Sequence, residues 1–281
     1  MTNEIWSTTD FPYICLKDSK RTKIFRQAIR NVVNKGDIVL DIGAGSGILS
    51  FFAAEAGAKR VYAVEIEPFL AETIRKSVTA NSLDNVIKVL EGNAVDLELP
   101  KDIDIVIAEL IETGLLDEQQ VPVLNSLNNK HYINATTQFI PYRYTTSLQL
   151  VNTDNKYYGF TILSPKHEWP FYKSNDTDWY RTTISPVTNV VDINSVTFGN
   201  KIIDTHIDTT VSFKRTSNLP ANAIRITGKV YLSKEIIIDS CLALNGDKIL
   251  SINPVTELGE INMKISYERG GGLHSFQATQ I

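Results

Sequence analysis

The stretch Ile38-Val-Leu-Asp-Ile-Gly-Ala-Gly-Ser-Gly-Ile-Leu-Ser-Phe-Phe-Ala-Ala-Glu-Ala-Gly57 decides the fold class of this chain. Its first residues, 38–40, are apolar and mostly β-branched, which is typical of a strand covered on both faces of a sheet. Residues 48–56 have the composition of a helix, and Gly57 is placed to end it. Glycines at every second position in between allow positive φ angles and a close approach of a ligand to the backbone. The stretch therefore predicts a strand, a ligand-binding turn and a helix whose first N–H groups face the ligand.

The spacing of the acid and the glycines indicates which ligand this turn binds. The dinucleotide fingerprint G-x-G-x-x-G would need its third glycine at position 48, which is Ile48. The pattern here is Asp-x-Gly-x-Gly-x-Gly, starting at Asp41 and continuing through Gly43, Gly45 and Gly47. It resembles motif I of class I methyltransferases, which bind S-adenosylmethionine (SAM). A structural turn that binds no ligand is the alternative.

The next apolar run, residues 60–66, ends with an acid that suits ribose recognition. Glu65 lies at the end of this expected strand, where a carboxylate can accept hydrogen bonds from ribose hydroxyls. Dinucleotide-binding and SAM-binding folds both place an acid there. Glu65 therefore supports a nucleoside-containing cofactor without deciding between the two classes.

Length and composition narrow the function classes. The chain has 281 residues, 21% of them charged, and a formal net charge of -4. This is an ordinary globular composition, and the mild acidity argues against nonspecific nucleic-acid binding. The two cysteines, Cys15 and Cys241, form no C-x-x-C pattern, so we expect neither a disulfide framework nor a metal site. The sequence shows no signal peptide and no apolar run long enough to span a bilayer, which predicts a cytoplasmic protein without a membrane partner.

The sequence pattern that predicts secondary structure changes near Pro141. Before it, expected strands alternate with expected helices over 20–34, 48–56, 68–80 and 115–127, which predicts a parallel doubly wound sheet. After it, short β-branched runs separated by Asn, Asp, Gly and Pro predict antiparallel strands. We therefore expect an α/β chain with a Rossmann-like domain over 1–141 and an antiparallel β-barrel or sandwich domain over 142–281.

Two glutamates nine residues apart follow the fourth expected strand, 103–110. Glu109 lies at the carboxyl end of that strand, the edge where ligands bind in open α/β sheets, and Glu118 lies where we expect a helix to start. Two carboxylates can hold a guanidinium through paired, charge-assisted hydrogen bonds. Solvated charges are the alternative for both, and for the intervening Glu112 and Asp117 we expect solvation.

Together these features resemble the protein arginine methyltransferases. The segment Leu16-Lys-Asp-Ser-Lys-Arg-Thr22 is similar to the family's M-L-K-D-x-x-R-T segment, and 137–141 and 157–160 resemble its step between domains and a barrel motif. The resemblance implies that Arg21 binds the SAM carboxylate. It also implies that Asn93 and Ala94 contact the adenine, and that Glu109 and Glu118 are catalytic.

The chain also departs from that family. The family's W-M-G-Y segment is replaced here by Leu110-Ile-Glu-Thr113, and its T-H-W loop by Leu244-Asn-Gly-Asp247. Residues 151–157 are too few for a full dimerisation arm.

We expect a SAM-dependent N-methyltransferase acting on a guanidinium nitrogen of an arginine-containing peptide or protein, or of a small guanidine. The alternatives are methylation of another small molecule and a catalytically silent SAM-binding module. A nucleic-acid acceptor is not expected, whereas a homodimer is suggested by the resemblance.

Overall fold

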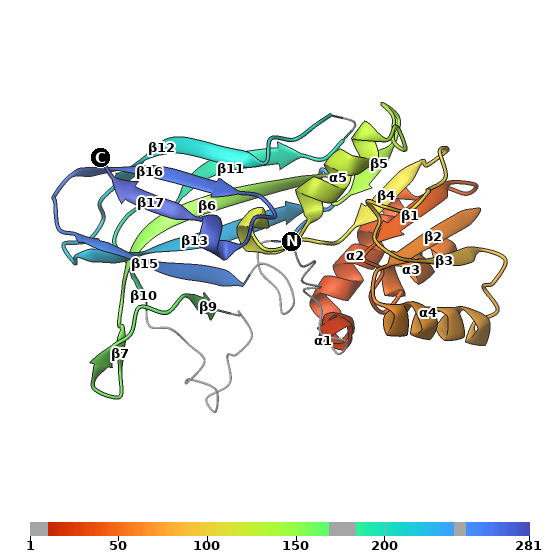
Figure 1. Cartoon of the computed structure of the whole chain (residues 1–281), viewed down its shortest axis with the longest axis horizontal. Helices are drawn as coiled ribbons and strands as arrows, with labels where there is room; N and C mark the ends of the chain where they lie inside the picture. Colours follow the sequence, from red (N-terminus) through yellow and green to blue (C-terminus); the bar gives the residue numbers. More distant parts are fainter. Residues whose placement is uncertain (1–10, 169–183, 200, 239–245) are drawn as a thin grey trace.

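The computed structural model describes residues 11–168, 184–199, 201–238 and 246–281. A parallel sheet with its helices and a larger set of antiparallel strands lie at opposite ends of the long axis (Figure 1). Helix α5 and the segment that precedes it lie at the junction between them. No described helix is long and apolar enough to cross a membrane.

Five parallel strands form the first sheet, in the order β3-β2-β1-β4-β5. They are β1 (Ile38–Ile42), β2 (Arg60–Glu65), β3 (Ile87–Glu91), β4 (Ile105–Ala108) and β5 (Gln138–Ile140). The α-helices in the described part of the chain are α1 (Phe11–Lys17), α2 (Ser19–Val32), α3 (Ile48–Ala56), α4 (Pro68–Ala80) and α5 (Gln120–Asn129). The Rossmann-like α/β prediction is thus confirmed.

The helix boundaries follow from local sequence signals. The Asp18 side chain accepts a hydrogen bond from Arg21 N at 3.0 Å and starts α2, while Pro68 occupies the first turn of α4. The helix expected over 115–127 was placed too early. Pro122 lies in the first turn of the observed α5, where its missing N–H costs no hydrogen bond. Glu118 therefore precedes the helix by two residues instead of starting it.

Antiparallel strands make up the rest of the fold. The larger sheet runs β10-β6-β13-β15-β9, with β11 paired to β6 and β14 to β13. Its strands are β6 (Arg143–Thr153), β9 (Lys166–Glu168), β10 (Ile184–Pro186), β11 (Val191–Thr197), β13 (Ala221–Tyr231), β14 (Ile237–Ile238) and β15 (Asp247–Val255). The smaller sheet joins β12 (His206–Lys214), β16 (Glu260–Glu268) and β17 (Gln277–Gln280), and β7 (Lys156–Tyr157) pairs with β8 (Phe160–Thr161).

These two sheets pack as a sandwich. Buried side chains of β6 and β13, such as Leu148 and Ile226, share one apolar cluster with Phe213 of β12 and Ile265 of β16. Over the described residues the larger sheet has two unjoined edges, β10 and β9. The sandwich expectation is confirmed, and the expected β-barrel is wrong because the sheet does not close.

Candidate active site

The glycine turn between β1 and α3 has the geometry that its sequence predicts. Gly43, Gly45 and Gly47 have φ angles of 71°, 55° and 82°, values that only glycine adopts at little cost. The N–H groups of Gly43 and Ala44 both donate to Val64 O at 3.0 Å, which ties the turn to β2. A Cβ atom at Gly43 would lie 2.4 Å from Leu110 Cδ2, so the turn also packs against the segment after β4.

Glu65 crosses from β2 to the glycine turn. It is 4% exposed, and its Oε2 accepts a hydrogen bond from Gly45 N at 2.7 Å while Oε1 accepts one from Glu67 N at 3.0 Å. These two bonds fix the carboxylate at the carboxyl edge of the sheet. It can accept further hydrogen bonds there, as a ribose-binding acid requires.

Asp41 is a buried carboxyl group with an unused acceptor. It is 1% exposed, and its Oδ2 accepts a hydrogen bond from Ser50 Oγ at 2.6 Å. Its Oδ1 is buried and receives no hydrogen bond from any described residue. The pKa of Asp41 is raised from 3.8 to about 7, chiefly by burial, to which the negative charges of Glu65 and Glu109 add while the hydrogen bond from Ser50 opposes the rise. A cationic ligand group would satisfy this oxygen, and the α-ammonium of SAM is one.

Asn93 and Ala94 follow β3 at the same edge. The Asn93 side chain accepts a hydrogen bond from Val95 N at 3.1 Å, and its backbone carbonyl accepts from Asp96 N at 2.9 Å. Ala94 is 5% exposed. Both residues form a compact turn, and Gly92 N donates to Glu65 O at 2.9 Å, so this turn adjoins the acid on β2.

Arg21 and Glu109, predicted for different ligands, pair with each other. Arg21 comes from α2, is 3% exposed and packs over the ring of Phe25, with its guanidinium carbon 4.9 Å from the ring centroid. Its Nη2 donates to Glu109 Oε2 in an ion pair. Burial raises the pKa of Glu109, and the Arg21 charge opposes that shift. Glu109 is thus already in contact with a guanidinium.

Glu118 is the second predicted catalytic residue and is partly buried. Burial raises its pKa well above the ordinary 4.5, and the negative charges of Glu109 and Glu112 raise it further. The structure therefore brings Glu109 and Glu118 into one electrostatic neighbourhood, although nine residues separate them in the chain. Raised carboxyl pKa values are typical of functional sites.

Glu112 and Asp117, which we expected to be solvated, belong to a buried ion cluster. Lys248 of β15 forms ion pairs with Glu112 Oε1 and Asp117 Oδ2. Glu112 is 5% exposed, and burial raises its pKa to about 7 while the Lys248 charge opposes the rise. The expectation was wrong because the segment lies against the antiparallel strands, which bury Glu112 and leave the Asp117 side chain 22% exposed.

Backbone contacts fix the same segment to the antiparallel strands. Gly114 N donates to Tyr144 Oη at 2.8 Å, and Thr113 Oγ1 donates to Gly246 O at 2.5 Å. The carbonyls of Leu115 and Leu116 accept from Gly270 N at 2.9 Å and Gly272 N at 2.8 Å. The segment from 109 to 118 thus starts at the end of a strand of the parallel sheet and is held by residues of the antiparallel half of the chain.

Sequence reasoning missed three residues that shape this site. Gln120 is 1% exposed and its Oε1 accepts from Leu110 N at 3.1 Å, which supports the residue after Glu109. Lys248 stands in a β-type run that carries no signal of a functional lysine. Cys15 of α1 lies near Arg21 and Glu109, and burial raises its thiol pKa to about 12, so it stays protonated. Among the described residues, no group of three or more His, Cys, Asp and Glu side chains could hold a metal ion.

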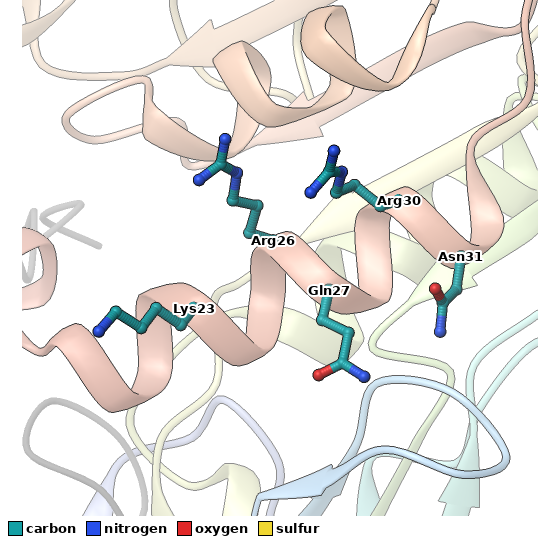
Figure 2. Close-up of a pocket in the computed structure, with 5 residues that line it drawn as sticks. All are labelled: Lys23, Arg26, Gln27, Arg30 and Asn31. Carbon is teal, nitrogen blue, oxygen red and sulfur yellow. The ribbon is translucent and has the colours of Figure 1, made fainter.

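The opposite face of α2 is basic and exposed. Figure 2 shows Arg26 and Arg30 leaving the helix on one side, and Gln27 and Asn31 on the other, along a shallow pocket that Lys23 also lines. Arg26 Nε donates to Glu55 Oε2 of α3 at 2.8 Å, which joins the two helices. Arg21 belongs to the buried face, so the same helix contributes separately to the site and to the surface.

Comparisons with known proteins show to which family the chain belongs. The family described as TRM5/TYW2 methyltransferase domain matches residues 16–157, about half of the chain. An uncharacterized protein of Methanocaldococcus jannaschii is 30% identical over 268 residues, covering 94% of both chains. Protein arginine N-methyltransferase 9 of Xenopus laevis is 40% identical over 124 residues, which is 42% of this chain and 15% of that protein.

A solved structure extends the fold similarity to the antiparallel half. The Trypanosoma brucei PRMT1 enzyme-prozyme heterotetrameric complex with AdoHcy has a TM-score of 0.71 at 18% identity, covering 95% of both chains. At that identity the likeness concerns the fold, while the family match and the site geometry carry the cofactor. The chain belongs to the TRM5/TYW2 methyltransferase-domain family and is a class I methyltransferase, similar to the protein arginine methyltransferases, whose cofactor is S-adenosylmethionine.

Proposed function

We propose that this enzyme methylates a guanidinium nitrogen of arginine, in a peptide or protein or in a small molecule. The observation that carries the proposal is the pairing of Glu109 with the Arg21 guanidinium beside a second raised-pKa carboxyl group, Glu118. Two such carboxylates match the geometry of a guanidinium. Relatives named protein arginine N-methyltransferases support the same acceptor.

The cofactor site that we propose lies along the carboxyl edge of the parallel sheet. Glu65 would bind the ribose hydroxyls, Asp41 the α-ammonium and Arg21 the carboxylate of SAM, and Asn93 and Ala94 would contact its adenine. The glycines 43, 45 and 47 would let the cofactor approach the backbone. We also propose that residues 1–141 form the cofactor-binding domain and residues 142–281 the domain that contacts the substrate or a partner.

Positioning accounts for the proposed catalysis. A guanidinium has a pKa above about 12, so it cannot be deprotonated before transfer. Glu109 and Glu118 would accept hydrogen bonds from two of its nitrogens and hold the third in line with the methyl carbon. SAM supplies a methyl group activated by its sulfonium. The acceptor nitrogen loses one proton in the reaction, and the raised pKa of Glu118 suits it to receive that proton.

Methyl transfer from isotopically labelled SAM tests this proposal. Free arginine and an arginine-rich peptide are incubated separately with the enzyme, and the products are read by mass spectrometry. Label on the peptide alone would support a peptide or protein modifier, and label on free arginine would support a metabolic enzyme. Label on neither, with SAM binding confirmed, would discard arginine as the acceptor.

We further propose that the enzyme forms a homodimer. The β7–β8 hairpin projects from the antiparallel strands (Figure 1) and exposes Tyr158 and Phe160, which are 100% and 70% exposed. Exposed aromatic side chains of this kind are typical of interaction sites. Light scattering of the wild type and of the double variant Tyr158→Ser/Phe160→Ser tests this proposal. We expect the wild type to be a dimer and the double variant to be a monomer, and a monomeric wild type would refute the proposal.

A further inference from the structure

One buried lysine pairs with two acids of the segment between the two proposed catalytic glutamates. Lys248 is 4% exposed in its side chain and lies on β15, whereas its partners Glu112 and Asp117 lie between Glu109 and Glu118. The two carboxylates also bond to the backbone. Glu112 Oε2 accepts from Asp117 N at 3.1 Å, and Asp117 Oδ1 accepts from Leu273 N at 2.6 Å.

Glu112 is buried and Asp117 is partly buried, and Lys248 supplies a compensating positive charge to both at once. Asp117 is the residue directly before Glu118, so the position of its carboxylate constrains the backbone that carries Glu118. The charges of Glu112 and Lys248 also act on Glu118 itself. Among the contacts that join the antiparallel strands to this segment, Lys248 makes the ion pairs, and it makes them with both acids.

We infer that Lys248 is a positioning residue: by bridging Glu112 and Asp117 to β15, it orients the Glu118 carboxylate for the methyl acceptor. Its effect on turnover rests on the proposed function, whereas its effect on the order of the segment does not. Lys248 would contact neither SAM nor the acceptor. It acts on the acceptor through Glu118.

Lys248→Met tests the inference, with Lys264→Met as the matched control. Lys264 pairs with a single acid, Asp208, at 3.2 Å on the exposed face of β16, and its side chain is 55% exposed. In Lys248→Met we expect kcat to fall about 10²-fold, because a small misplacement of a reacting group costs that much. The Kd for SAM should stay within about twofold, since its proposed ligands lie on other strands. Amide hydrogen exchange over 110–119 should accelerate at least about tenfold. The control should change none of these.

A triple variant without the three charges of the cluster tests whether Lys248 positions the segment or only neutralises its two acids. This variant can still be measured if Lys248→Met does not fold. In Lys248→Met/Glu112→Gln/Asp117→Asn the amide oxygens can still accept the two backbone hydrogen bonds, but the link to β15 is lost. We expect this variant to fold, to exchange quickly over 110–119 and to keep a low kcat. Wild-type kcat and exchange in it would overturn the inference, and so would a parallel loss of SAM binding in Lys248→Met. If the wild type methylates neither arginine substrate, the proposed function fails and the exchange comparison still decides the role of Lys248.

Discussion

At the scale of single residues, Glu118 is the proposed base and one of the two proposed ligands of the acceptor guanidinium. Glu118→Gln removes the negative charge and the base while keeping the shape, so we expect kcat for an arginine acceptor to fall by about 10²–10⁴-fold. Because burial and two neighbouring acids raise its pKa, the wild-type kcat/KM should rise with pH through a value above the ordinary 4.5. Steady-state kinetics from pH 5 to 9 measures both effects. Normal turnover in Glu118→Gln and Glu109→Gln with intact SAM binding would show that the acceptor is not clamped by these residues.

Asp41 makes a second prediction at the same scale, for the protein without cofactor. A carboxyl group whose pKa is raised by folding destabilises the folded state fully above that pKa and less as the pH falls. For Asp41 this cost is therefore present above about pH 7 and is relieved progressively towards pH 3.8. Asp41→Asn removes this cost, which grows by about 1.4 kcal/mol per pH unit between those two pH values. Thermal unfolding of both proteins at pH 5.5 and 8 should show a greater gain from the substitution at pH 8. An equal gain at both values would contradict the raised pKa.

At the scale of elements, the short 3₁₀ turn η1 (Thr113–Leu115) joins the two sheets. Gly114 has φ = 82°, and a Cβ there would lie 3.1 Å from Leu116 Cδ1 and 3.3 Å from Ile226 Cγ2 of β13. We expect Gly114→Ala to lower the free energy of unfolding by about 2–3 kcal/mol, since strain and overpacking add. Gly36→Ala is the matched control, because Gly36 has φ = 101° and nothing within 4 Å of an added Cβ. It should lose only about 1 kcal/mol in urea denaturation. Equal losses would mean that the turn adapts to the methyl group.

The whole molecule responds to its cofactor. We expect SAM to bind the folded chain and not the unfolded one. At a SAM concentration one hundred times its Kd, the free energy of unfolding should then rise by about 2.7 kcal/mol. For a chain of this size, that raises the Tm by roughly 5–10 °C. Differential scanning calorimetry measures the shift. Glu65→Gln weakens a proposed ribose contact and should reduce the shift, whereas Glu118→Gln should keep it. The reverse pattern would remove Glu65 from the cofactor site.

The sequence by itself determined the α/β class, and with it the glycine turn and the acids at the carboxyl edge of the parallel sheet. Motif I, the strand–helix alternation and Glu65 are local patterns, because neighbouring residues form the strand, the turn and the helix. Parallel strands then necessarily place their carboxyl ends on one edge. Asp41, Glu65, Asn93 and Glu109 could therefore be expected there from the sequence. The antiparallel strands after Pro141 were also predictable, because their period of two is a local signal.

Only the tertiary structure decided how the catalytic segment is held. Lys248 lies 131 residues from Asp117, and no local pattern couples a lysine in a strand to two acids that distant. The burial that makes Glu112 a member of an ion cluster comes from packing against β13 and β15, so it is invisible in the segment itself. Closure of a sheet is likewise decided by pairings between distant strands, which is why an open sandwich, and no barrel, emerged. Local physics thus specified the carboxyl edge of the parallel sheet, and long-range contacts specified how residues 109–118 are held.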